Sequence, residues 1–177
     1  MRIINLAPLA VLTKSCLAYP ASISPLQPRD QYCSNAPAIK AGTTFNRRAP
    51  APDALTPRSS SNNVFWCVRN SQTYITLAMT SMLAQSQVWP VLRLALMSAN
   101  RRTTGYDRLL PEGIFKAEAG PMVLIIRNAN NHQLTRAVLS GAVWALTDYM
   151  VEKDEFGTMV FDIFDGGNKV GAGSISF

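Results

Sequence analysis

The character of the sequence changes at Asn63, and this change limits what the chain can fold into. Residues 19–62 contain seven of the eleven prolines, three consecutive serines at 59–61, and no sustained apolar period. Such a segment buries too little apolar surface to fold by itself, so we expect a flexible arm. Residues 63–177 carry short periodic apolar segments, which predict one folded domain. A length of 177 residues excludes two large domains.

The first eighteen residues have the features of a secretory signal peptide. Arg2 precedes a mostly apolar run, Ile3–Leu12, and small residues precede a cut after Ala18. Lys14 interrupts the apolar character, and a mitochondrial presequence is the alternative. No later apolar stretch reaches the roughly 18 residues that a membrane-spanning helix needs. We therefore predict a secreted, extracellular protein.

Removal of residues 1–18 leaves two cysteines, Cys33 and Cys67. In an oxidising compartment an even pair suggests one disulfide. The cut also removes Arg2 and Lys14, which lowers the formal net charge from +6 to +4. A positive charge fits a nucleic-acid or membrane-surface partner, but it fits an ordinary basic protein equally well.

Arg47 and Arg48 resemble a dibasic processing site within the arm. A cut there would release an N-terminal propeptide together with Cys33. The alternative is that both arginines lie in a solvated arm without being processed.

Eight segments of the domain have strand or helix periodicity. Strand signals occur at 64–68, 73–80, 113–118, 122–127 and 158–163, and a last strand follows the turn at 165–168. One helix is expected from Pro90, in its first turn, to Asn100, with a single kinked helix from about Thr80 as the alternative. A second is expected from Asn130, where Gln133 completes a capping-box-like start, to about Val151.

The order of these segments predicts the fold class. Two strands, a helix, two strands, a helix and two strands contain a βαββαβ kernel. We expect an α+β fold, a two-layer sandwich in which a mixed or antiparallel sheet of about five to six strands is covered by two helices.

Catalytic and metal-binding patterns are weak. His132 is the only histidine, so a hydrolase would have to use it, and a structural role beside the helix start is the simpler interpretation. A zinc site needs about four close ligands, which the sequence does not offer. Asp148, Glu152, Asp154 and Glu155 crowd one helix end, where a solvated acidic surface is expected rather than a cation site. We predict no catalytic residue, metal or cofactor.

Nucleic-acid binding is the alternative from another class. The βαββαβ order is that of RNA-recognition modules, and basic residues are available for phosphate contacts. Those modules carry an aromatic-rich signature on a central strand, whereas Gly113–Glu118 offers one aromatic residue and an acid.

Trp144 is the one large aromatic residue that the predicted second helix places on its polar side. At about 100° per residue it projects with Arg136 and Ser140, away from Leu134 and Val138. Either another part of the chain covers Trp144, or it anchors a partner together with Arg136, since tryptophan and arginine are frequent at interface hot spots.

Asn128–Thr135 and Phe161–Gly171 resemble segments of small secreted proteins of filamentous ascomycete fungi, many of them candidate effectors. The resemblance covers about the last third of the chain and involves a helix cap and a hairpin turn rather than catalytic residues. It implies a secreted fungal interaction protein that binds a host or cell-surface protein.

Overall fold

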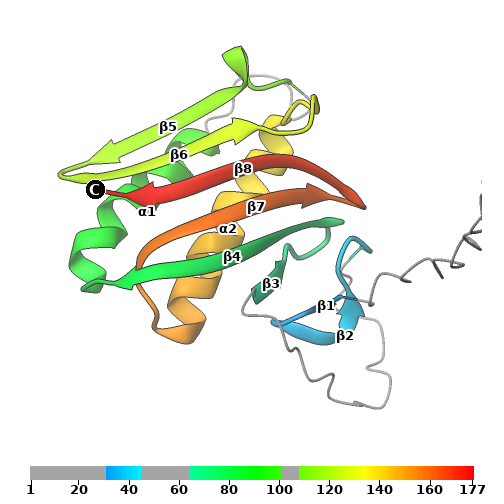
Figure 1. Ribbon diagram of the computed structural model, residues 1–177, viewed down its shortest axis with the longest axis horizontal. Helices are drawn as coiled ribbons and strands as arrows, with labels where there is room; N and C mark the ends of the chain where they lie inside the picture. The colour runs from blue at the N-terminus through cyan, green and yellow to red at the C-terminus, as the bar shows by residue number, and fades with distance from the viewer. Residues whose placement is uncertain (1–30, 45–63, 101–107) are drawn as a thin grey trace, which may run out of the picture.

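The computed structural model of the protein describes residues 31–44, 64–100 and 108–177. They form a six-stranded antiparallel sheet, a two-stranded hairpin and two α-helices (Figure 1). The predicted α+β sandwich is confirmed, and its sheet is antiparallel throughout. The predicted signal peptide, the cut after Ala18 and the Arg47-Arg48 site lie outside the described residues.

The strands and helices follow the predicted order, preceded by the hairpin. They are β1 (Tyr32–Cys33), β2 (Ala36–Lys40), β3 (Val64–Cys67), β4 (Thr73–Met82), α1 (Gln85–Ala99), a 3-10 turn (Pro111–Gly113), β5 (Ile114–Ala119), β6 (Met122–Asn128), α2 (Arg136–Lys153), β7 (Gly157–Asp165) and β8 (Asn168–Ser176).

The strand order in the large sheet is β3-β4-β7-β8-β6-β5. The C-terminal hairpin of β7 and β8 therefore lies in the middle of the sheet, between β4 and β6. Both helices cover one face, α1 against β5 and β6 and α2 against β3 and β4 (Figure 1). This arrangement leaves β3 and β5 as the two edge strands.

The core lies between the sheet and the helices. Alternate strand residues enter it, such as Ile75 and Leu77 of β4 and their register partners Ile163 and Phe161 of β7. Leu92 of α1 and Leu146 of α2 are fully buried against them. The period-two pattern of the strands thus corresponds to one buried and one outward face.

Both predicted starts of the first helix are wrong. β4 continues to Met82, which pairs with Gly157, and α1 begins at Gln85, so Pro90 lies inside the helix. At this position proline removes one intrahelical hydrogen bond, and its ring crowds the carbonyl of Ser86, four residues earlier. The continued pairing of β4 with β7 explains why the region after Thr80 is strand and not helix.

The second helix begins later than the capping-box-like pattern predicts. Asn130 and Asn131 have φ angles of 53° and 58°, which belong to a turn rather than to a helix start. Thr135 is the N-cap, and its hydroxyl accepts a hydrogen bond of 3.3 Å from the Val138 N–H. Asparagine and threonine are both suitable N-cap residues, so the spacing of residues could not distinguish Asn130 from Thr135 as the cap.

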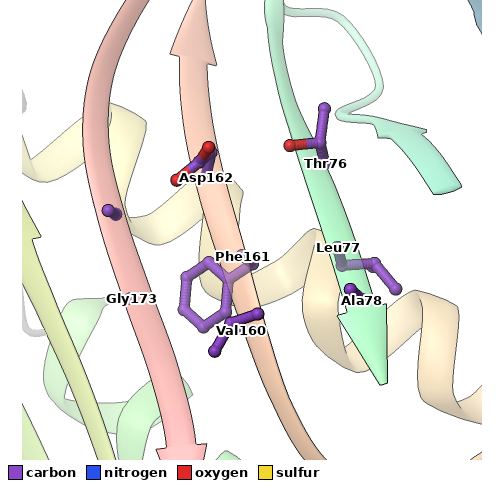
Figure 2. A pocket seen from close by; sticks show the side chains of 8 residues that line it. Thr76, Leu77, Ala78, Val160, Phe161, Asp162 and Gly173 are labelled. Carbon is purple, nitrogen blue, oxygen red and sulfur yellow. The ribbon is translucent and has the colours of Figure 1, made fainter. Parts of the chain in front are cut away.

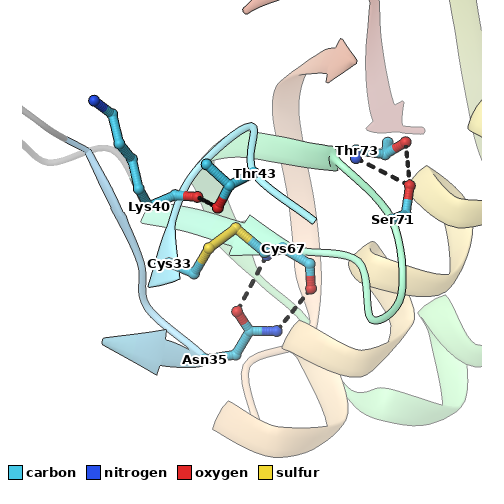
Figure 3. The surroundings of a disulfide bond; sticks show 7 residues. All are labelled: Cys33, Asn35, Lys40, Thr43, Cys67, Ser71 and Thr73. Carbon is cyan, nitrogen blue, oxygen red and sulfur yellow. Dashed lines mark hydrogen bonds between the residues drawn. A yellow bond between two sulfur atoms is a disulfide. The ribbon is translucent and has the colours of Figure 1, made fainter. Parts of the chain in front are cut away.

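Part of the predicted arm is ordered. β1 and β2 form a hairpin, and the predicted disulfide is present between Cys33 of β1 and Cys67 of β3, with 5.6 Å between their Cα atoms (Figure 3). A two-stranded hairpin is marginal on its own, so its order depends on this attachment. A cut after Arg48 would leave the hairpin covalently attached instead of releasing it with Cys33.

The hairpin also bonds to part of the free edge of β3. The side-chain amide of Asn35 donates to the Cys67 carbonyl at 2.9 Å, and its oxygen accepts from the Cys67 N–H at 3.1 Å (Figure 3). The Ser34 N–H donates to the Phe65 carbonyl at 2.6 Å. These three bonds occupy the Phe65 carbonyl and both backbone groups of Cys67, which a further strand would otherwise pair with.

A second, smaller hydrophobic cluster lies beneath the hairpin, on the sheet face opposite the helices. Tyr74 of β4 stacks on Phe164 of β7 with 4.7 Å between ring centroids, and burial raises the pKa of Tyr74. Gly42 has a φ of 84°, and a Cβ there would lie 2.6 Å from the Gly166 carbonyl oxygen. Glycine therefore allows the chain after β2 to approach the β7–β8 turn closely.

Candidate functional site

Trp144 lies on the outward face of α2 and is 45% exposed. The guanidinium carbon of Arg69, in the segment between β3 and β4, lies 6.0 Å from the centroid of its ring. This is the separation at which a cation is attracted to an aromatic face. The described residues thus place an arginine beside Trp144 but do not cover it.

Gly141 determines how closely the segment that carries Arg69 approaches α2. A Cβ at Gly141 would lie 3.3 Å from a methyl carbon of Val68, which immediately precedes Arg69. Because this is tighter than an ordinary contact, the absence of a side chain lets Val68 pack directly on α2 one turn before Trp144. Gly141 thus leaves room for the segment that carries Arg69 to pack closely on α2 near Trp144.

Arg136, the predicted companion of Trp144, is not its neighbour. It lies eight residues earlier on α2, which is about 12 Å along the helix axis. Its Nε is buried and has no hydrogen-bond partner among the described residues, while its backbone N–H donates to the Arg108 carbonyl at 2.9 Å. Arg136 thus lies at the start of α2, and Arg69 is the arginine beside the Trp144 ring.

Sequence reasoning missed Arg69 because the contact joins α2 to a turn 75 residues earlier in the chain. The only local signal is an arginine next to asparagine and serine in a short connection between two strand patterns. Such a position predicts exposure, but it does not predict which helix lies nearby.

Beneath the exposed face, α2 is fixed to β3 by polar contacts. The indole N–H of Trp66, which is fully buried, donates to Asp148 at 3.0 Å. Trp66 also meets the Tyr149 ring edge to face at 5.3 Å, and the Tyr149 hydroxyl donates to Glu155. Burial, followed by this bond and the Glu155 charge, raises the pKa of Tyr149 well above its usual range.

These contacts also use two of the four acidic residues that crowd the end of α2. Asp148 accepts from Trp66 and Glu155 accepts from Tyr149. No cluster of three or more histidine, cysteine or acidic residues suited to a metal ion occurs in residues 31–44, 64–100 and 108–177. Asp148 and Glu155 therefore have structural roles here.

His132 is exposed, in the turn before α2. Its backbone N–H donates to the Ala129 carbonyl at 2.9 Å. Cys33 and Cys67 are joined in the disulfide, so neither thiol is free to act as a nucleophile. The structure brings no nucleophile and base together at His132 in the described part of the chain.

The sheet face opposite the helices carries a shallow open groove of about 450 Å³ across β4, β7 and β8 (Figure 2). Its lining is mostly small, with Thr76 and Ala78 of β4, Val160 of β7 and Ala172 of β8. The one charged side chain, Asp162, pairs with Lys169 at 2.8 Å. A small, shallow surface of this kind provides few contacts for a tightly held ligand.

Among the described helices, neither combines the length and the apolar character that crossing a membrane requires. Comparisons of the chain with protein-family models, curated proteins and solved structures find no match.

Proposed function

We propose that this chain is a small secreted fungal interaction protein, of the candidate-effector kind, that binds a host or cell-surface protein. The observation that carries the proposal is the exposed Trp144 on α2 with Arg69 beside its ring. Tryptophan and arginine are the side chains most enriched at the centres of protein interfaces. The disulfide supports an oxidising compartment, since structural disulfides are rare in the cytosol.

The face around Trp144 suits protein binding because it is held rigid from below. Asp148 and Tyr149, which follow Trp144 on α2, are both fixed by hydrogen bonds to β3 or to the end of the helix. A preorganised anchor loses less conformational entropy on binding than a flexible one. Val151 extends the same side of the helix and is also exposed.

Nucleic-acid binding receives less support from the structure. Phe115, the aromatic residue of β5, packs against the helix side of the core. Phe65, Tyr74 and Phe164, which lie on the other sheet face, are in the cluster beneath the hairpin. Base stacking on a sheet requires accessible aromatic rings, and the described part of that face has none outside this cluster.

Capture of a partner from host extract tests the proposal. Immobilised mature protein is expected to retain a specific host or cell-surface protein, and Trp144→Ala is expected to weaken that binding by about 2 kcal/mol or more. Arg69→Ala should weaken it to a smaller extent. The matched control is Trp89→Ala, since Trp89 is a tryptophan of similar exposure, 37%, on α1.

Loss of binding in Trp89→Ala but not in Trp144→Ala would assign the site to α1 and contradict the proposal. Salt-sensitive retention of RNA or DNA, with no specific protein captured, would favour the nucleic-acid alternative. Activity on a substrate that disappears in folded His132→Ala would favour an enzyme.

A further inference from the structure

We propose that β5 pairs with β5 of a second copy of this chain, so that two sheets join edge to edge in a symmetric dimer. This inference goes beyond the proposed function and involves a different surface from Trp144. It rests on the state of the two sheet edges and on the charges of β5.

The two edges of the sheet differ. At the edge of β3, the Phe65 carbonyl and both backbone groups of Cys67 are bonded to Ser34 and Asn35 of the hairpin. β5 pairs with β6 on one side, and no described strand pairs with its other side (Figure 1). An uncapped edge strand presents backbone donors and acceptors that pair readily with another strand.

The charges of β5 complement themselves in one antiparallel register. Lys116 and Glu118 both project from the outward sheet face, and within one chain they pair with each other. When Ala117 lies opposite Ala117 of the second copy, each Lys116 lies opposite a Glu118. Opposite charges in directly facing positions stabilise a strand pair.

Neighbouring registers are disfavoured. A shift by two residues puts either Lys116 opposite Lys116 or Glu118 opposite Glu118, and facing like charges destabilise a strand pair. A shift by one residue would place the helix layers of the two copies on opposite faces of the joined sheet. Among these registers, the charges of β5 therefore favour the one centred on Ala117.

The helix layer contributes one exposed apolar side chain, Leu94 of α1, on the flank away from α2. The side-chain oxygen of Asn100, the residue that caps the end of α1, accepts a hydrogen bond from the Ser140 hydroxyl of α2, so this side of α1 faces α2. At about 100° per residue, Leu94 projects about 120° away from Asn100. Leu94 is 39% exposed, and α1 is the helix packed on β5 and β6. Edge-to-edge pairing would bring the side of α1 that carries Leu94 towards the same side of α1 in the second copy.

Sedimentation velocity over about 1 to 500 μM tests the proposal on the intact, oxidised chain. The wild type is expected to dimerise. Lys116→Glu puts glutamate opposite glutamate, and Glu118→Lys puts lysine opposite lysine, so each should raise the dimer dissociation constant by about tenfold or more. The double exchange should restore it to within about threefold, because it reverses both signs.

A mixture gives the sharpest result. Chains with Lys116→Glu carry two negative charges on β5, and chains with Glu118→Lys carry two positive charges. Neither should self-associate well, whereas an equimolar mixture should form heterodimers. Arg93→Glu, at an exposed position of α1, has the same charge change as Lys116→Glu and should leave the dimer intact.

Thermal unfolding checks that all variants are folded, which is expected because both exchanged side chains are exposed. A wild type that stays monomeric over the whole range would overturn the proposal. So would a dimer that tolerates both single exchanges, or one that the double exchange and the mixture fail to restore.

Discussion

Trp66 of β3 donates its indole hydrogen to Asp148 of α2, across 82 positions of the chain. The indole is fully buried, so this bond satisfies a donor that has no access to water. It connects the strand that carries the disulfide to the helix that carries Trp144. The contact is therefore a direct link between the covalently fixed edge of the sheet and the candidate binding face.

Asp148→Ala should lower the free energy of unfolding by about 1 to 3 kcal/mol, because it leaves the buried indole donor unsatisfied. Urea unfolding measures this as a lower midpoint at an unchanged slope. Glu152→Ala, at an exposed position of the same helix, is the control and should have little effect. Equal effects of the two substitutions would show that the bond contributes nothing specific.

Tyr149 should stay protonated in the folded protein where an ordinary tyrosine ionises, near pH 10. Because its folded pKa is raised, its contribution to stability is complete below pH 10 and decreases as the pH rises above that value. Absorbance at alkaline pH should show the same ionisation step for wild type and Tyr149→Phe while both are folded. After unfolding, the wild type should show one more ionised tyrosine than Tyr149→Phe. A smaller step in the folded variant would mean that Tyr149 titrates normally.

Replacing Cys33 and Cys67 together by serine should release the hairpin and leave the large sheet folded. Closing this loop is worth about 3 to 4 kcal/mol at most, and the hairpin adds few large apolar side chains of its own. Hydrogen exchange should show fast amides in Tyr32–Lys40 and slow amides in β7 and β8. Slow exchange in both regions would show that Asn35 and the apolar cluster hold the hairpin without the disulfide.

Trp144→Ala should lower the melting temperature by only a few degrees, about 1 kcal/mol, because nearly half of the side chain is exposed. Trp66→Ala should cost about 3 to 5 kcal/mol, because that indole is fully buried. In a dilute monomer, acrylamide should quench the fluorescence that disappears in Trp144→Phe. A large loss of stability in Trp144→Ala, or shielding of its fluorescence, would place the residue in the core.

The order and type of the elements could be predicted from the sequence because each has a local pattern. Ile75, Leu77 and Met79 alternate with smaller residues such as Thr76 and Ala78, and the Asp165–Asn168 turn has the glycines that a tight hairpin requires. The position of the last hairpin between β4 and β6 could not be predicted, since strand order depends on contacts between distant segments.

The candidate site was predictable only in part, for the same reason. The helical period placed Trp144 on the outward side of its helix, but Arg69 reaches it from a distant turn. The hairpin was missed because its order comes from Cys67 and Tyr74, which lie outside the proline-rich segment. The composition of a segment indicates whether it folds by itself, but it does not show whether contacts with a distant segment will order it.

The cap that Asn35 places on β3 has a consequence for the size of any assembly built by strand pairing. A sheet with two free edges can add copies without limit and grow into a filament. A sheet with one free edge can pair with only one further copy. In the proposed dimer each outer end is a β3 strand whose Cys67 backbone groups and Phe65 carbonyl are already bonded to the hairpin. The hairpin at one edge of the molecule therefore limits how the proposed dimer could grow, although it lies at the opposite edge from the pairing strand.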